Sequence, residues 1–159
     1  MFSLFSRQAD PMPALSSQLY DERTFYSAFV KDLTNCNKVA IIESPYLTRK
    51  RATYLADTLR KLTSRGVAVR VNTREPSHHT PQLEQEAWGA IGILQTAGVK
   101  VFLCSDMRHR KLAVLNDTIL WEGSLNILSQ NNSREIMRRT VSPEQCRQMT
   151  NLTGIYKKH

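Results

Sequence analysis

The sequence predicts an α/β fold with a mixed, mostly parallel β-sheet flanked by helices on both faces. Segments with apolar residues at helical spacing alternate with short β-prone runs over about the first hundred residues. Such alternation implies crossover connections between parallel strands. The pattern then changes to that of a hairpin. A chain of 159 residues, 41% of them hydrophobic, fits one domain with a core of its own.

The first part of the chain alternates helix and strand. Apolar residues recur at helical spacing between Thr48 and Arg65, and Gly66 follows as a stop signal. Thr80-Pro81 is a typical helix start, with a capping residue and a proline at the first helical position. Helices are therefore expected at 21–35, 48–65 and from 80 up to Gly98, and strands at 39–42, 67–71 and 99–103.

After residue 103 the sequence predicts strands at 110–115 and 118–122, separated by the turn-forming pair Asn116-Asp117. A further strand is expected at 133–141 and a last helix from Ser142 to about 152. Residues 1–19 contain two prolines and no clear period, so they are predicted to be a flexible N-terminal tail or an edge segment. The predicted domain is then 20–159.

The charge balance favours a polyanionic partner. Lys and Arg number 22 against 14 Asp and Glu, a formal net charge of +8, which suits nucleic acid or anionic lipid headgroups. No run of 18 apolar residues occurs, so stable membrane insertion is not expected. Three scattered cysteines without a CxxC pair favour free thiols over a disulfide framework or zinc site. The apolar start is too short for a signal-peptide core, so a cytoplasmic location is predicted.

The candidate chemistry lies around the predicted hairpin. His109 and Lys111 are two residues apart on a strand and therefore project from the same face. This pair suits a phosphate, with lysine as the point charge and imidazole as nucleophile or proton carrier. The second strand ends in Gly123-Ser124-Leu125-Asn126, where Ser124 and Asn126 offer polar donors. The hairpin is expected to bring these four side chains into one pocket.

Three further residues are candidates for the same site. Glu135 is predicted to orient the imidazole through its Nδ1 atom and raise its basicity, although a solvated carboxylate would look the same in sequence. Arg138 is a candidate substrate-binding residue because alternate residues of its strand can face the site. Tyr46 follows a strand end, where open α/β sheets place ligands, and either stacks on a base or covers the core.

The spacing of these residues resembles the signature of the phospholipase D superfamily, namely HxK, four residues, an acidic position, six residues, and GSxN. Here it starts at His109-x-Lys111 and ends at Gly123-Ser124-x-Asn126, with Asn116 at the acidic position and Asp117 one residue late. The resemblance covers about residues 20–149 and is greatest to the stand-alone or helicase-associated branch, which includes one-motif bacterial nucleases. In that family the aspartate supports structure, so the change to Asn116 is expected to be tolerated.

The resemblance implies a site built from two HxK motifs, and this chain holds one. It therefore implies a homodimer with a composite site on its two-fold axis. One His109 would form a phosphohistidine, and the other would protonate the leaving oxygen and then activate water. Two copies each of Lys111 and Asn126 would hold the nonbridging oxygens. The implied activity is a DNA endonuclease that needs no metal and no cofactor.

Two other functions remain open at this point. A phospholipid-cleaving enzyme would use the same chemistry, but it calls for an interfacial segment, of which Phe2, Leu4 and Phe5 are at most a weak version. A catalytically weak nucleic-acid-binding module associated with a helicase would also carry the motif. Asn116 keeps this second possibility open.

Overall fold

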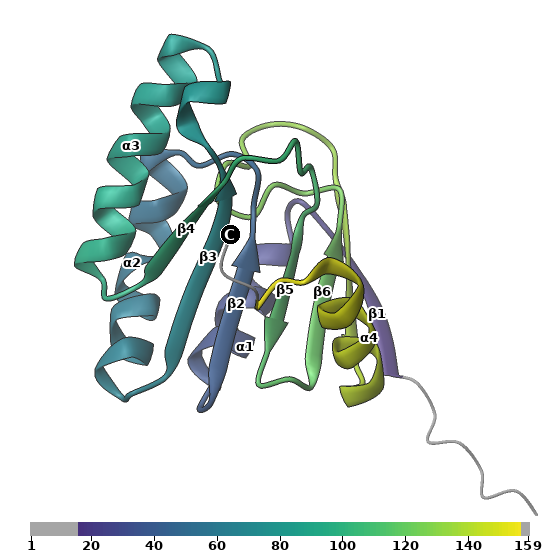
Figure 1. Ribbon diagram of the computed structural model, residues 1–159. Coiled ribbons are helices and arrows are strands. Elements are labelled where there is room, and N and C mark those ends of the chain that lie inside the picture. Colours follow the sequence, from purple (N-terminus) through teal and green to yellow (C-terminus); the bar gives the residue numbers. More distant parts are fainter. Residues whose placement is uncertain (1–15, 157–159) are drawn as a thin grey trace, which may run out of the picture.

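The computed structural model describes residues 16–156, which form one seven-stranded sheet with helices packed on it (Figure 1). The strand order is β1-β7-β6-β5-β2-β3-β4. The strands are β1 (Ser16–Asp21), β2 (Val39–Glu43), β3 (Ala68–Arg74), β4 (Lys100–Cys104), β5 (Leu112–Leu115), β6 (Ile119–Gly123) and β7 (Ile136–Val141). The helices are α1 (Phe25–Thr34), α2 (Arg49–Ser64), α3 (Pro81–Thr96) and α4 (Pro143–Thr153), with a short 3-10 turn η1 (Pro76–His78).

The mixed α/β class is confirmed, but the expectation of a mostly parallel sheet is wrong. Within the described part of the chain, only the pairs β2–β3 and β3–β4 are parallel. The pairs β2–β5, β5–β6, β6–β7 and β1–β7 are antiparallel. The cause is the connection from β4 to β5, which spans residues 105–111. A parallel return needs a crossover of a dozen or more residues, so this short segment returns the chain antiparallel beside β2.

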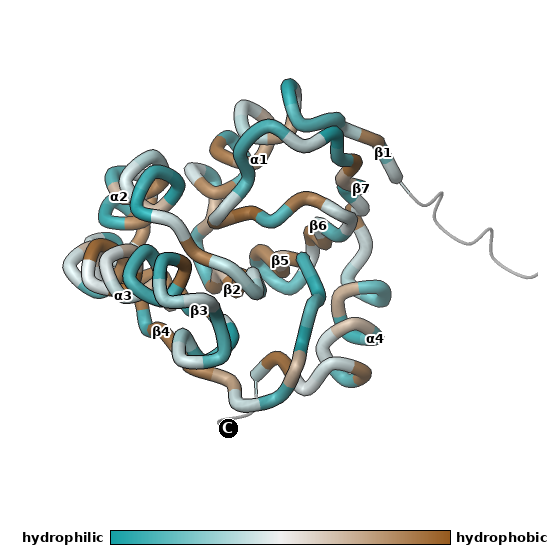
Figure 2. Tube along the Cα trace, turned by 90° about the horizontal axis from the view of Figure 1, so that it is seen from above, coloured by the Kyte–Doolittle hydropathy of each residue, from teal (hydrophilic) through white to brown (hydrophobic). Residues whose placement is uncertain are grey.

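Helices cover both faces of the sheet, as the sequence predicts. Seen from above, α1 and α4 lie on opposite sides of β5 and β6 (Figure 2). The larger core lies under α1, α2 and α3, where Trp121 of β6 meets Phe25 and Phe29 of α1 edge to face. The smaller core joins Val114 and Leu120 to Cys146 of α4. Alternate residues of each central strand thus serve different cores.

Local signals fix most of the element ends. The side chain of Thr48 accepts the Arg51 N–H at the start of α2, and Ser142 caps α4 in the same way. Gly66 and Gly98 follow α2 and α3 at φ +83°, a conformation that favours glycine. The first helix starts later than expected. Asp21 ends β1, and its carboxylate accepts the N–H groups of the turn before α1.

The N-terminal boundary falls inside a strand. Residues 16–19 belong to β1, which pairs with β7 at the edge of the sheet, from Ser16 opposite Val141 to Asp21 opposite Ile136. Residues 1–15, the rest of the predicted tail, lie outside the described residues. No helix in the range 16–156 is long and apolar enough to cross a membrane. All three cysteines are free and buried, and burial raises the pKa of the Cys36 and Cys146 thiols to about 11.

Asn116 has a structural role in the β5–β6 hairpin. Asn116 and Asp117 adopt φ values of 54° and 56°, as a type I′ hairpin turn requires, and asparagine and aspartate tolerate this region. The Asn116 Oδ1 atom accepts the backbone N–H groups of Asn37 (3.1 Å) and Lys38 (2.9 Å). The turn therefore fastens β5 and β6 to the loop between α1 and β2.

Replacing Asn116 by alanine is expected to lower the free energy of unfolding by about 2–3 kcal/mol, because two N–H groups lose their acceptor and alanine is strained at positive φ. Asn116→Asp keeps an acceptor oxygen and a residue that tolerates the turn, so its loss should stay below about 1 kcal/mol. Urea unfolding of both variants measures the difference. Equal losses would show that the side chain does not fasten the loop.

Candidate active site

The HxK residues lie in the extended segment that leads into the central strand β5. This segment lies along the edge of the sheet formed by the strand ends, not beside an edge strand. The strand begins at Leu112 rather than at residue 110, so both residues precede it. The Lys111 Nζ atom lies 2.6 Å from His109 Nδ1 and 2.9 Å from the His109 carbonyl oxygen. The two side chains therefore lie on the same side, as their spacing predicts. The carboxyl ends of β2, β3, β4 and β6 reach this same edge.

A buried ion-pair cluster holds the HxK segment in place. Glu43, at the end of β2, is fully buried. Its carboxylate pairs with the guanidinium groups of Arg108 (3.2 Å) and Arg110 (2.6 Å). These arginines alternate with His109 and Lys111 and point to the opposite side of the extended segment. The Glu43 cluster, defined as Glu43, Arg108 and Arg110, thus fixes the backbone from which His109 and Lys111 project.

Lys111 and His109 meet at the Nδ1 atom of the imidazole. An ammonium group only donates hydrogen bonds, so a charged Lys111 in this contact favours the tautomer whose Nδ1 atom accepts. Burial lowers the pKa of Lys111, and the charge of Glu135 opposes that shift. Glu135 was predicted to bind the Nδ1 atom of His109, but in the structure Lys111 contacts that atom. The effect of Glu135 is instead to favour the charged form of Lys111.

The GSxN segment begins where β6 ends. A Cβ at Gly123 would lie 2.1 Å from the Ile136 carbonyl oxygen, so glycine is needed for the close approach of β7. The backbone N–H of Gly123 donates to the Lys111 carbonyl (3.3 Å), which places this segment beside the HxK segment. The Ser124 hydroxyl accepts the Ile136 N–H (3.1 Å). That bond closes the turn, and substrate contact by Ser124 stays a prediction.

Asn126 starts a tight turn that is anchored to α1, α2 and the loop after β2. Its carbonyl oxygen accepts the N–H groups of Ser129 and Gln130, while its Oδ1 atom is buried without a partner. A buried polar atom without a partner is costly, which makes this amide a candidate ligand group. The turn is anchored by Tyr26 Oη to the Ile127 carbonyl, Ser44 Oγ to the Leu128 N–H, and Arg51 Nε to the Gln130 carbonyl.

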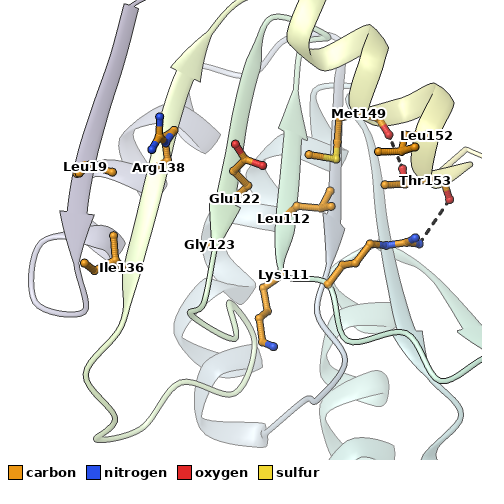
Figure 3. A pocket seen from close by; sticks show the side chains of 11 residues that line it. Leu19, Lys111, Leu112, Glu122, Gly123, Ile136, Arg138, Met149, Leu152 and Thr153 are labelled. Carbon is orange, nitrogen blue, oxygen red and sulfur yellow. Dashed lines mark hydrogen bonds between the residues drawn. The ribbon is translucent and has the colours of Figure 1, made fainter.

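The two remaining predicted substrate-binding residues, Tyr46 and Arg138, lie at different distances from the HxK pair. The Tyr46 ring meets the His109 ring edge to face at 5.9 Å, so Tyr46 lies beside the HxK pair, and its contact with substrate stays a prediction. Arg138 lies on β7, where it pairs in register with Glu122 of β6. It lines a groove of about 600 Å³ that also reaches Lys111 (Figure 3). Arg138 and Lys111 thus share a groove without a contact, and Met149 and Leu152 of α4 form its apolar wall.

Sequence reasoning missed the Glu43 cluster and one buried arginine, Arg74. The signal for the cluster was present, because Arg108 and Arg110 sit at alternate positions around His109 and Glu43 ends a β-prone run. A carboxylate at a strand end and two arginines at period-two spacing are compatible with an internal ion pair. Their pairing depends on β5 lying beside β2, which sequence periodicity does not reveal.

Comparison with known proteins places these features in a family. Residues 29–153 match the model of a family described as cardiolipin synthase, PLD-like domain. NucT from Helicobacter pylori superposes with a TM-score of 0.70 at 20% identity, over 87% of this chain and 92% of that one. Nuc from Salmonella typhimurium, a phospholipase D family member, gives 0.72 at 14% identity, over 86% and 90%.

A phosphatidylserine synthase from Haemophilus influenzae superposes with a TM-score of 0.63 at 14% identity, over 91% of this chain but only 39% of its own. At these identities the structural likeness concerns the fold. None of the curated proteins compared with the sequence matches it. The described residues thus have nearly the extent of NucT and Nuc.

Proposed function

Because this chain belongs to the phospholipase D superfamily of phosphodiesterases, as a PLD-like domain, we propose that it is a metal-independent nuclease that cleaves DNA. The observation that carries this proposal is the HxK pair. His109 and Lys111 contact each other at the open edge of the sheet, held by the Glu43 cluster and flanked by the GSxN segment. An exposed imidazole beside an ammonium group suits nucleophilic attack on a phosphodiester.

The proposed reaction has two steps. The Nε2 atom of one His109 attacks phosphorus, the P–N bond forms, and the P–O bond to the leaving alkoxide breaks. His109 of the partner subunit donates its proton to that oxygen. In the second step this same imidazole takes a proton from water, whose oxygen attacks phosphorus and displaces the first imidazole. Lys111 and Asn126 stabilise the charge of both transition states.

Binding of the substrate prepares His109 for attack. In the unliganded chain the Lys111 contact favours the ring proton on Nε2, which is the wrong tautomer for a nucleophile. A phosphate draws the Lys111 Nζ atom towards its oxygens and releases Nδ1. Glu135, whose charge already acts on Lys111, is then available to accept a hydrogen bond from Nδ1–H. The exposed ring exchanges protons with water, losing the one on Nε2 and gaining one on Nδ1, so the nucleophilic lone pair on Nε2 becomes free.

The single HxK motif supports a homodimer, because the composite site needs two copies of it. The matched region has nearly the extent of NucT and Nuc and less than half that of the phosphatidylserine synthase. Leu19 on the edge strand β1 and Ile136 on its neighbour β7 are large apolar side chains, 60% and 57% exposed, beside the groove that reaches Lys111. A second copy would bury such a surface. The free thiols suit a reducing compartment and support the predicted cytoplasmic location.

The formal net charge of +8 supports nucleic acid as the substrate. One observation favours a second candidate function, cleavage of a phospholipid. The groove beside Lys111 has an apolar wall that includes Met149 and Leu152. Asn116, in contrast, no longer argues for a binding-only module, because its side chain serves the hairpin and the α1–β2 loop.

The purified protein is expected to cleave DNA in excess EDTA. Supercoiled plasmid, a single-stranded oligonucleotide, a single-stranded RNA of the same sequence and phosphatidylglycerol vesicles are assayed in parallel. We expect DNA to be cleaved at least about tenfold faster than phospholipid, because the basic surface concentrates a polyanion. Raising the salt from 50 to 200 mM should slow DNA cleavage at subsaturating substrate.

Each other outcome contradicts a part of the proposal. Faster lipid cleavage would favour the phospholipase function and the apolar groove as its binding site. DNA binding without cleavage of any substrate would favour the binding-only module. Activity that needs an added divalent cation would contradict the histidine mechanism.

A further inference from the structure

Arg74 is a buried arginine at the edge of the sheet that carries the candidate site. It is the last residue of β3, and only 7% of its surface is exposed. In open α/β sheets ligands bind beyond the carboxyl ends of parallel strands, and Arg74 occupies such an end. Its guanidinium lies 3.4 Å from the Tyr46 hydroxyl, and the Tyr46 ring contacts the ring of His109.

Within residues 16–156, no carboxylate forms an ion pair with the Arg74 guanidinium. Its Nη1 atom reaches Tyr46 Oη, its Nη2 atom lies 3.7 Å from the sulfur of Met107, and its Nε atom is buried without a partner. The neighbouring buried arginine, Arg108, is by contrast paired with Glu43 and Asp106. A buried cation is costly when unpaired, so the Arg74 guanidinium is suited to bind an anion.

Two rings lie beside this guanidinium. The His79 and Tyr46 ring centroids are 4.9 Å apart with an interplanar angle of 35°. The His79 Nε2 atom is buried and has no partner. Burial and the Arg74 charge both lower the pKa of His79, so its ring is neutral at pH 7. Neutral aromatic rings beside an arginine are the groups on which nucleobases stack.

We propose that Arg74, Tyr46 and His79 form a second substrate subsite, which binds the phosphate next to the scissile one and the nucleoside attached to it. The inference rests on the proposed nuclease function and names the extra contact that a polynucleotide makes and a simple diester lacks. Arg74 binds the phosphate oxygens, and the Tyr46 and His79 rings pack on the nucleoside. Tyr46 connects this subsite to His109.

The catalytic test compares two chromogenic esters. Thymidine 5′-(p-nitrophenyl phosphate) has one phosphate, and the corresponding thymidine dinucleotide ester has a second one. The wild-type protein is expected to have a higher kcat/KM for the two-phosphate ester. In Arg74→Ala this preference should fall at least about tenfold, because a charge-assisted hydrogen bond to the second phosphate is lost. Arg74→Lys should retain part of it.

Arg60→Ala is the matched control, because it removes one arginine from the exposed surface of α2, where Arg60 pairs with Asp57. It should leave the preference for the second phosphate within about twofold of wild type. An unchanged preference in Arg74→Ala would overturn the subsite. So would an equal fall in Arg60→Ala, because the effect would then be one of overall charge.

A binding test works even if no ester is cleaved. A fluorescein-labelled single-stranded 12-mer is titrated with His109→Ala and with the double variant His109→Ala/Arg74→Ala. The second substitution should raise Kd about tenfold and reduce the salt dependence of binding by about one ion. Equal Kd values would overturn the subsite. Weakened binding together with no cleavage by wild type would uphold the subsite and reject the phosphodiesterase.

Discussion

Replacing His109 by alanine is expected to lower the rate of DNA cleavage in EDTA by at least about 10⁴-fold, because the variant lacks both the nucleophile and the proton donor. The side chain is exposed at the edge of the sheet, and its ring contacts are Tyr46 and the Lys111 ammonium group. Its removal should therefore leave the melting temperature within about 2 °C of wild type. Plasmid cleavage and a thermal melt on the same sample measure both quantities.

The matched control is His78→Ala, an exposed histidine of the 3-10 turn η1. It should cleave DNA at a rate within about twofold of wild type. Equal activity of His109→Ala and wild type would place the chemistry elsewhere or identify a contaminating nuclease. Equal inactivity of the two variants would point to a general effect on this edge of the sheet.

Mixing His109→Ala with wild type tests the composite site. When subunits are exchanged at random, a site that needs His109 from both subunits is intact in a fraction equal to the square of the wild-type share. An equal mixture should thus retain about a quarter of the wild-type activity. Retention of about half, with the exchange verified by a tagged subunit, would show that each subunit works alone.

Replacing Glu43 by glutamine is expected to lower the free energy of unfolding by about 3–5 kcal/mol. The substitution keeps the shape of the side chain but leaves Arg108 and Arg110 without their shared carboxylate. Arg108 is buried and keeps only the partly exposed Asp106 as a partner, so most of its desolvation cost is no longer offset. Urea unfolding followed by tryptophan fluorescence measures the loss, since Trp121 lies in the core.

The control is Glu86→Gln, which breaks the pair between Glu86 and Arg49 on the surface of α2 and α3. Exposed pairs contribute little, so its loss should stay below about 1 kcal/mol. Glu43→Gln should also lower kcat in the fraction that remains folded, because the segment that carries His109 loses its anchor. Similar losses of stability in the two variants would contradict the anchoring role of the Glu43 cluster.

Elements with local signals were predictable from the sequence. The second and third helices begin at Thr48 and Thr80 as N-caps and are followed by Gly66 and Gly98, so their ends were nearly right. The strand directions were not predictable in the same way. They depend on which strands become neighbours, and the pairing of β5 with β2 and of β1 with β7 joins residues far apart in sequence.

The residues of the candidate site differ in the same way: some belong to a local sequence pattern, and others meet only in the folded chain. His109, Lys111 and Asn126 could be proposed from the sequence because their spacing is a local pattern, and the contact between His109 and Lys111 confirms that these two side chains lie on the same side. The Glu43 cluster was missed because its members meet only through the sheet. Arg74 was missed because a lone arginine at a strand end gives no pattern. Its significance comes from burial without an ion pair within residues 16–156, which only the tertiary structure shows.

The pairing of β1 with β7 makes the order of synthesis matter for folding. Residues 25–104 hold three helices and three adjacent strands, so this part has its contacts close together in sequence. Strand β1 precedes residues 25–104 in the sequence, yet it pairs with β7, which ends at Val141. During translation β1 must therefore wait, unpaired, until nearly the whole chain has emerged. Long-range pairing of this kind folds slowly, so docking of β1 is expected to be the late step that completes the sheet.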